Sequence, residues 1–388
     1  MMKESGNMEL DLQKIRQEID RIDREIVKCF EERMNIVLKV AEYKKINKMQ
    51  IIDQEREKQV IAKNIDLLSN KNYTKALGIV LEKLMAVSRG LQQNLLEESP
   101  VGDNFILSDG YKESNMLIGY QGVPGSFSQQ ALQNHFSGHQ IKENYYLTFE
   151  EVFKAVKSKE INYGVLPIEN STTGAVNEIY DLLNNYDVCI VGEQSLKIEQ
   201  CLLAKAGTRL EDVKQVYSHP QGFQQSKDFL ADYPHWEHIA YFNTAKSAQH
   251  VAESSNEHLA AIAGKQVMDI YSLEILAENI NLNIKNHTRF IVISNKQEVF
   301  PDSNKISLII SLPHKSGSLA RVLNYFEEEN INLLKLESRP DQNKNWTYYF
   351  YIDFEGSLQD KSVQKALGKV NADSVYFKIL GNYPAHKE

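Results

Sequence analysis

Two cations lie on a helical stripe that is otherwise apolar and that we expect to be buried. The stripe recurs at spacings of three or four residues through Leu12, Ile15, Ile19, Ile22, Ile26, Cys29, Arg33, Val37, Val40 and Lys44. Arg33 and Lys44 are 11 residues apart, which is about three helical turns. One long cationic side chain can lie along apolar surface and reach water, but two on one stripe favour a buried polar site.

Further polar residues fall on the segments that follow. They are Arg56, Glu57, Ser88 and Gln92, and Ser88 and Gln92 form an i, i+4 pair on one helix face. A cavity in a helical bundle lined by these side chains, Arg33 and Lys44 would suit a small polyanion. We expect Asp53 to be the N-cap of the helix that carries Arg56.

Four polar segments adjoin apolar runs farther along the chain. They are Gly119–Ser128, Gly164–Gly174, Ser218–Gln225 and Asn286–Phe290. A glycine-rich turn that opens a helix can bind an anion, and open α/β sheets bind ligands where strands end. Each segment taken alone is equally explained as a capped turn. We expect His219 and His287 to be structural residues or hydrogen-bond partners near a site, because no HExxH or CxxC pattern accompanies them.

The elements that must position these residues change along the chain. Residues 7–77 contain no glycine and the first proline is Pro100, which predicts helices. A helix from Glu9 to Lys45 would be roughly 55 Å long and would need a partner, most simply a second copy of itself. From Met116, short apolar runs alternate with helical stretches, which indicates an α/β domain. The expected buried strands are Met116–Tyr120, Tyr163–Ile168, Val188–Val191 and Ala260–Ala263.

The last 80 or so residues follow a βαββαβ order, which is the ferredoxin-like pattern. We therefore predict a multi-domain protein in which linkers separate three domains. The predicted ranges are an all-α domain 1–96, a linker 97–115, an α/β domain 116–295, a linker 296–304 and an α+β domain 305–385.

Composition excludes several classes of protein. The chain has 388 residues, 42% of them apolar and 25% charged, which is typical of folded globular proteins. A net charge of −8 argues against non-specific nucleic-acid binding. No apolar run approaches the roughly 20 residues that span a bilayer, and the first residues do not resemble a signal peptide, so we expect no membrane partner. Cys29, Cys189 and Cys201 are expected to be reduced core residues of a cytoplasmic protein.

Residues 9–95 resemble the all-helical chorismate mutase family. The matching residues are Ile15–Asp23, Glu32, Arg33, Lys44, Asp53–Glu57, Ser88 and Gln92. The resemblance implies a homodimer, or a tetramer, in which Arg16 of one chain completes the pocket of another. It also implies that chorismate is bound by Arg16, Arg33, Asp53, Arg56, Glu57 and Ser88. Lys44 and Gln92 would hydrogen-bond the ether oxygen as its bond breaks.

The four polar segments together resemble prephenate dehydratase over residues 116–295, which implies a two-lobed α/β domain. The resemblance implies that Thr288 is catalytic, that Asn170, Ser218 and Gln225 line the pocket, and that Arg289 anchors a substrate carboxylate. The substrate would be prephenate and the product phenylpyruvate. This chemistry calls for no cofactor or metal.

Two segments of the last domain resemble the amino-acid-binding ACT domain of the same enzymes. The residues implied in regulation are Gly317, Ser318, Leu319, Ala320, Glu337, Ser338, Arg339 and Pro340. The resemblance implies that L-phenylalanine binds between two such domains and inhibits the dehydratase. A purely structural domain is the alternative.

The whole chain therefore resembles a bifunctional enzyme of phenylalanine biosynthesis, regulated by its end product. Three alternatives remain open at this point. The chain could be a non-catalytic amino-acid sensor, its dehydratase could prefer arogenate, or a mutase could be fused to an inactive second domain.

The amide side chain of Gln92 leads us to predict how mutase activity depends on pH. A pericyclic rearrangement needs no acid, base or nucleophile, so the protein holds the compact conformer and stabilises charge on the breaking ether oxygen. Because an amide N–H donates without prior protonation, mutase activity should persist at neutral to mildly alkaline pH. Chorismate consumption measured across this range checks the prediction, and a collapse above about pH 6 would contradict it.

Overall fold

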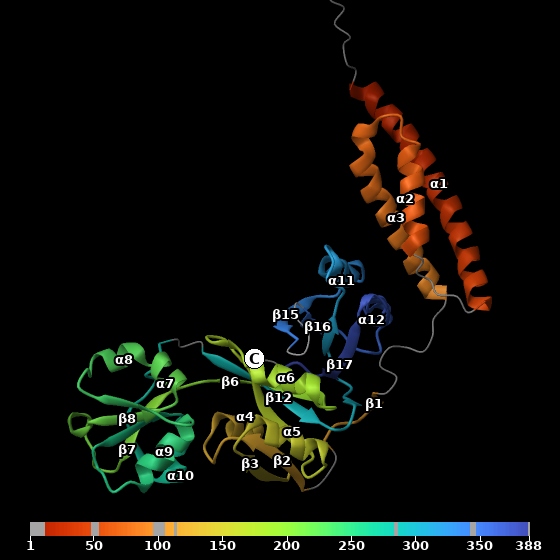
Figure 1. The fold of residues 1–388 in the computed structure, drawn as a ribbon. Coiled ribbons are helices and arrows are strands. Elements are labelled where there is room, and N and C mark those ends of the chain that lie inside the picture. Colours follow the sequence, from red (N-terminus) through yellow and green to blue (C-terminus); the bar gives the residue numbers. More distant parts are fainter. Residues whose placement is uncertain are drawn as a thin grey trace, which may run out of the picture. The chain divides into compact units, whose positions relative to one another are not determined.

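The computed structural model describes residues 12–47, 54–95, 105–111, 115–282, 286–341 and 347–386. It divides into two compact units, Met1–Pro100 and Val101–Glu388 (Figure 1). Each unit has its own architecture and is described by itself. No helix among the described residues is both long and apolar enough to cross a membrane.

The first unit is helical. Its elements are α1 (Leu12–Ile46), α2 (Gln54–Asp66), a 3-10 turn (Lys71–Tyr73) and α3 (Thr74–Leu95). Helix α3 packs against both α1 and α2. Among the described residues the buried side chains of this unit are Met34, Ala41, Met85, Ser88 and Gln92, so polar groups lie inside the bundle as the sequence predicts.

The first half of the apolar stripe on α1 is exposed. Leu12, Ile15, Ile19, Ile22 and Ile26 are 39–60% exposed. The prediction that this stretch is buried is wrong for the single chain, and so is the prediction that Cys29 is a core residue, whereas Cys189 and Cys201 are buried. The reason is length, because the 35 residues of α1 extend about 52 Å and the 22 residues of α3 only about 33 Å.

The second unit begins with a six-stranded sheet, which forms the first lobe (115–198 with 286–295). The path is β3-β2-β4-β12-β6, with β5 paired to β4. The strands are β2 (Met116–Gln121), β3 (Ile141–Tyr146), β4 (Tyr163–Asn170), β5 (Gly174–Ala175), β6 (Cys189–Lys197) and β12 (His287–Ser294). The helices are α4 (Phe127–His135), α5 (Phe149–Lys157) and α6 (Asn177–Asn185).

The second lobe (199–282) is inserted between β6 and β12. Its sheet has the order β11-β7-β10-β8-β9. The strands are β7 (Cys201–Lys205), β8 (Gln215–Ser218), β9 (Glu237–Ala240), β10 (Leu259–Ala263) and β11 (Leu273–Ala277). The helices are a 3-10 turn (Leu210–Asp212), α7 (Pro220–Gln225), α8 (Lys227–Ala231), α9 (Thr244–Glu253) and α10 (Val267–Tyr271). The predicted two-lobed α/β domain is confirmed.

The C-terminal domain has the predicted βαββαβ order. Its elements are β14 (Lys305–Ser311), α11 (Ser318–Glu328), β15 (Leu333–Pro340), β16 (Tyr348–Glu355), α12 (Lys361–Asp373) and β17 (Tyr376–Tyr383). The sheet is antiparallel with the order β15-β16-β14-β17.

Both faces of this C-terminal sheet are covered, because side chains of a strand alternate between faces. Ile306, Leu308 and Ile310 of β14 pack in one cluster with α11 and α12. Ile309 and Tyr351 lie in a different cluster, together with side chains of the first lobe. The first lobe and the C-terminal domain therefore share a hydrophobic core.

The two predicted linkers contain paired backbone. Strand β1 (Ile106–Leu107) lies within predicted linker 97–115, and β13 (Glu298–Val299) lies within predicted linker 296–304. They form a parallel two-stranded sheet, with Ile106 opposite Glu298. These positions are therefore not simple connectors, and local composition could not indicate a pairing across almost 200 residues.

Gly381 tests the shared core. A Cβ at this position on β17 would lie 2.0 Å from the carbonyl oxygen of Ile190 on β6, so the strands must separate to admit it. We expect Gly381→Ala to destabilise the second unit by about 2–3 kcal/mol, as overpacking of a core does. Gly368 on α12 has no atom within 4 Å of such a Cβ, so Gly368→Ala is the control and should stabilise by about 1 kcal/mol. Calorimetric unfolding of the full chain measures both, and equal transitions for the two variants would contradict the shared core.

Candidate functional site

Thr288 and Asn170 face each other across the middle of the first-lobe sheet. They are register partners on β12 and β4. The Thr288 Oγ1 accepts a hydrogen bond from Asn170 Nδ2 at 2.9 Å. Asn170 Oδ1 accepts the backbone N–H groups of Thr172 and Thr173 at 2.9 and 3.1 Å, which fixes the turn after β4. The structure thus brings together two residues that are 118 positions apart in the sequence.

Asn286 completes this network, although the sequence assigned it no role. Its Oδ1 accepts from Asn170 Nδ2 at 2.7 Å and from Thr172 Oγ1 at 3.3 Å. Only 1% of Asn286 is exposed, and its Nδ2 has no hydrogen-bond partner in the described part of the chain. The signal that could have found it is its position two residues before Thr288, directly before the strand that carries Thr288.

The second lobe reaches this network through its Ser-His-Pro-Gln segment. Gln221 Nε2 donates to Thr173 Oγ1 at 2.8 Å, which joins α7 to the turn after β4. Gln225 is buried, and its Oε1 accepts from Gln200 Nε2 at 3.2 Å. Three of the four polar segments, Gly164–Gly174, Ser218–Gln225 and Asn286–Phe290, therefore meet where the lobes face each other.

Ser218 and His219 serve the second lobe itself. Ser218 is fully buried, and its hydroxyl donates to the carbonyl of Ile262 at 3.0 Å. His219 is the N-cap of α7, where its Nδ1 accepts the Gln221 N–H at 3.2 Å. Burial lowers the pKa of His219, which suits a neutral ring that accepts a hydrogen bond. The expectation that His219 is structural is confirmed. In the described residues no group of three or more His, Cys, Asp or Glu side chains could hold a metal ion.

The glycine-rich turn after β2 is a tight turn between the lobes. Ser126 is the N-cap of α4, and the Gly125 N–H donates to Gln129 Oε1 at 2.6 Å. The Gly125 and Pro124 carbonyls accept from Gln266 and Tyr271 of the second lobe at 2.9 and 2.8 Å. These contacts join the turn to α4 and to the second lobe.

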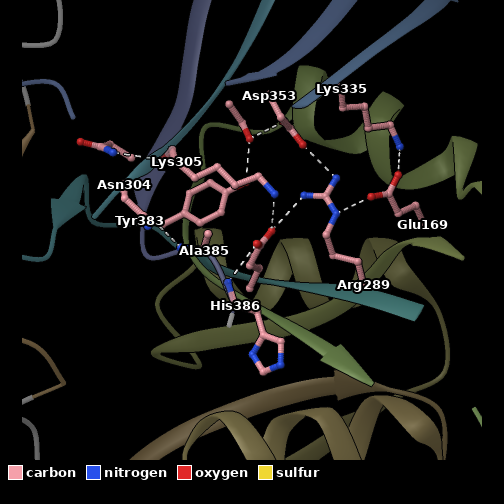
Figure 2. Close-up of polar contacts among 12 residues, drawn as sticks. Glu169, Arg289, Asn304, Lys305, Lys335, Asp353, Tyr383, Ala385 and His386 are labelled. Carbon is pink, nitrogen blue, oxygen red and sulfur yellow. Dashed lines mark hydrogen bonds and ion pairs between the residues drawn. The ribbon is translucent and has the colours of Figure 1, made fainter. Parts of the chain in front are cut away.

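Arg289 lies among three carboxylates. Its guanidinium donates to Glu169 at 2.6 Å, to Glu193 at 3.1 Å and to Asp353 at 2.9 Å (Figure 2). The side chain is 12% exposed. These contacts differ from the expectation that Arg289 anchors a substrate carboxylate, because its nitrogens are already paired. It joins the first lobe to β16 of the C-terminal domain.

Two lysines complete what we call the interdomain charge cluster, defined as Glu169, Glu193, Arg289, Lys305, Lys335 and Asp353. Lys305 donates to Glu193 at 2.8 Å, and Lys335 pairs with Glu169. Three carboxylates thus balance three cations (Figure 2). Burial opposes the charge of Arg289, but Asp353 and the other carboxylates hold its pKa well above its ordinary value. Burial alone would raise the pKa of Glu169. The positive charges of Arg289 and Lys335 outweigh this effect, so the pKa of Glu169 lies below its ordinary value.

The helical unit holds part of the predicted polar cavity. Arg33 Nη1 on α1 donates to Ser88 Oγ on α3 at 2.5 Å, and Ser88 Oγ donates to the Leu84 carbonyl at 2.7 Å. Burial lowers the pKa of Arg33. Gln92 is buried one turn beyond Ser88, and its Oε1 has no hydrogen-bond partner among the described residues.

The other predicted mutase residues are more open. Lys44 lies on α1 and is partly exposed, and Arg16 and Arg56 are exposed. Asp53 lies outside the described residues, and so does the side chain of Glu57. A single chain therefore brings Arg33, Ser88 and Gln92 together but leaves Arg16 at its surface.

The predicted regulatory residues divide into two groups. Gly317 precedes α11 with a φ of +82°, a conformation that favours glycine. Lys315, Ser318 and Leu319 line a cavity of about 310 Å³, which is also lined by Tyr348, Phe350 and Val375. Ala320 follows on α11.

The second group lies on β15, an edge strand of the C-terminal sheet. It comprises Glu337, Ser338, Arg339 and Pro340. Arg339 donates to Asp181 of α6 at 2.8 and 3.3 Å. This residue therefore contacts the first lobe rather than the cavity.

Comparison with known proteins gives the family. Models of chorismate mutase type II, prephenate dehydratase and the ACT domain match residues 15–93, 118–298 and 306–372. A bifunctional chorismate mutase/prephenate dehydratase of Enterobacter agglomerans is 32% identical over 378 residues, which cover 96% of this chain and 95% of that protein. The chain belongs to the bifunctional chorismate mutase/prephenate dehydratase family. It is an enzyme with a mutase domain, a dehydratase domain and an ACT domain.

Solved structures agree on the fold of the second unit. A prephenate dehydratase of Arthrobacter aurescens in complex with L-Phe has a TM-score of 0.64 and 26% identity, covering 69% of this chain and 90% of that one. GqqA, described as a novel type of quorum quenching acylase, has a TM-score of 0.63 and 27% identity, covering 70% of this chain and 98% of that one. One fold thus carries different described activities, and the site must decide between them.

Proposed function

We propose that this chain converts chorismate to prephenate in its helical domain and prephenate to phenylpyruvate in its two-lobed domain, and that L-phenylalanine inhibits the second reaction. The observation that carries the dehydratase proposal is the Thr288 hydroxyl held by Asn170 on adjacent strands. It lies in the domain that matches prephenate dehydratase.

The mutase proposal rests on positioning and charge. Arg33 supplies a fixed cation beside Ser88, and Gln92 supplies an amide one helical turn away. A guanidinium binds a carboxylate through two parallel N–H donors, so Arg33 suits one carboxylate of chorismate. The Gln92 N–H and Lys44 would stabilise the charge that grows on the ether oxygen. Arg16, Arg56, Glu57 and Asp53 complete the proposed set.

We propose a homodimer through α1. The exposed apolar residues of α1 support this dimer, and they are Leu12, Ile15, Ile19, Ile22 and Ile26. Helix α1 is longer than the helix α3 that packs on it, and an exposed apolar face of this length is expected to be covered by another chain. Arg16 lies on the same part of α1, so a second chain packed there would receive its guanidinium. The three cysteines are free thiols, which supports the cytoplasmic location that forms part of this proposal.

The dehydratase reaction needs one proton at one oxygen. The bond to the ring carboxylate breaks and its electron pair enters the ring as the ring hydroxyl departs. One proton turns that hydroxyl into water, and the products are CO₂, water and phenylpyruvate. Thr288 Oγ1 already accepts a hydrogen bond from Asn170, so its own O–H is available to donate to the departing hydroxyl. A threonine hydroxyl is a weak acid, so its part is hydrogen-bond donation.

Substitution of Thr288 tests this assignment. Thr288→Ala should lower phenylpyruvate formation from prephenate by about 10²–10³-fold, the usual effect of removing one such donor. Chorismate consumption should be unchanged, since it takes place in the other unit. Thr208, whose hydroxyl bonds a loop carbonyl at 3.4 Å, provides the matched control Thr208→Ala with parental activity. Dehydratase activity of Thr288→Ala within threefold of the parent would contradict the role, and faster turnover of arogenate than prephenate by the parent would correct the substrate.

The regulatory proposal rests on the cavity beside α11. Its lining joins aromatic and apolar side chains to Lys315 and to the start of a helix, which suits an amino acid with an aromatic side chain. A similar dehydratase has been solved with L-Phe, which supports this choice of ligand. Inhibition requires that the ligand favour one of two states of the enzyme. The interdomain charge cluster offers a connection, since Arg289 adjoins Thr288 on β12 and pairs with Asp353 of the ACT sheet.

Gly317 provides the test of regulation. Gly317→Leu adds a side chain at the entrance of α11, where it should block L-phenylalanine while prephenate turnover without inhibitor persists. Gly138 has nearly the same φ, +85° against +82°, and neither glycine has an atom within 4 Å of an added Cβ, so Gly138→Leu is the matched control for backbone strain. We expect the L-phenylalanine concentration for half inhibition to rise at least about tenfold in the first variant alone. Equal inhibition of both variants would overturn the assignment.

A further inference from the structure

The amide of Asn170 has one orientation that satisfies its surroundings. Its Oδ1 accepts two backbone N–H groups, from Thr172 and Thr173. Its Nδ2 lies 2.7 Å from Asn286 Oδ1, 2.9 Å from Thr288 Oγ1 and 3.1 Å from the His287 carbonyl, which are all acceptors in this arrangement. A flipped amide would place its oxygen against acceptors and its N–H groups against donors.

Asn286 holds the side of Asn170 that faces Thr288. An amide nitrogen has two hydrogens, and Asn286 Oδ1 takes the shorter of the two side-chain contacts. The second hydrogen is shared by Thr288 Oγ1 at 2.9 Å and the His287 carbonyl at 3.1 Å, and Thr288 Oγ1 is the nearer of the two. Thr172 Oγ1 donates to the same Asn286 oxygen at 3.3 Å, which sets the orientation of Asn286 in turn.

The position of Asn286 is costly for a residue with only a structural role. It is 1% exposed, and its Nδ2 has no hydrogen-bond partner among the described residues. An unsatisfied buried donor is destabilising, and native proteins retain few of them. The oxygen of Asn286 is fully used while its nitrogen is not, so its contribution to the network lies in the acceptor.

We propose that Asn286 is a positioning residue of the dehydratase, which acts through Asn170 on Thr288. Asn286 fixes the Asn170 amide, and the Asn170 N–H occupies a lone pair of Thr288 Oγ1. The Thr288 proton then points away from Asn170, toward the departing hydroxyl. This inference rests on the proposed donor role of Thr288.

Two substitutions separate this role from simple support of the fold. Asn286→Ala removes the acceptor and should lower kcat for prephenate by about 10²-fold, with KM within threefold, because the donor is misdirected while binding persists. Asn286→Asp keeps an oxygen acceptor at the same place, so kcat should return to within about tenfold of the parent. KM should rise in this variant because a carboxylate repels the prephenate dianion. Both are measured at pH 8, with thermal unfolding alongside.

Asn162 provides the matched control. Its Oδ1 accepts the Leu117 N–H at 2.8 Å, just before β4 begins and thus at the opposite end of that strand from Asn170. Asn162→Ala should lower the thermal transition and leave kcat within threefold of the parent. A loss of kcat in this control as large as in Asn286→Ala would mean that destabilisation alone explains both, and the proposal would be overturned.

A double-mutant cycle tests the path of action. If Asn286 acts through Thr288, adding Asn286→Ala to Thr288→Ala should cost less than about threefold more in kcat. A further 10²-fold loss in that background, or parental kcat in Asn286→Ala beside a slow Thr288→Ala, would overturn this proposal alone. Parental kcat in Thr288→Ala itself would instead overturn the role of Thr288 on which it rests.

Discussion

The second unit depends on six charges that neutralise one another between its first lobe and its C-terminal domain. Arg289 lies at their centre, with Glu169 and Glu193 from the first lobe and Asp353 from the ACT sheet. A buried ion pair adds little net stability, but removing one partner leaves a charge that costs several kcal/mol. Each domain therefore needs the other to keep its own charges paired. Neighbouring residues of a strand point to opposite faces of the sheet. Arg289 and Glu169 therefore point toward the ACT domain, whereas Thr288 and Asn170 point away from it.

The helical unit shows the opposite situation, a surface that its own chain does not complete. The C-terminal half of α1 packs on α3, where Arg33 donates to Ser88 and Gln92 is buried. The N-terminal half of α1 exposes its isoleucines, and Arg16 lies on that half. In the proposed dimer, the length of α1 would link the mutase site to assembly. In the proposed regulation, Arg289 would link the ACT domain to Thr288.

Sequence patterns predicted elements and motifs well and long-range partners poorly. Helices without glycine, buried β-strands and the βαββαβ order follow from local periodicity, and the structure has all of them. Thr288 and Asn170 could be expected to share a site because both belong to motifs that resemble prephenate dehydratase. The partners of Arg289 could not, since Glu193 and Asp353 lie 96 and 64 residues away in segments without any motif. The predicted burial of Ile19 and Cys29 is wrong for the same reason. Periodicity shows that a face is apolar but not which chain covers it.

One measurement tests the central claim that a single chain carries both reactions and their regulation. The purified full-length protein is given chorismate alone, and phenylpyruvate is followed with and without L-phenylalanine. We expect phenylpyruvate to form without added prephenate and its rate of formation to fall when L-phenylalanine is present. Prephenate that accumulates without phenylpyruvate, or chorismate that is not consumed, would contradict it.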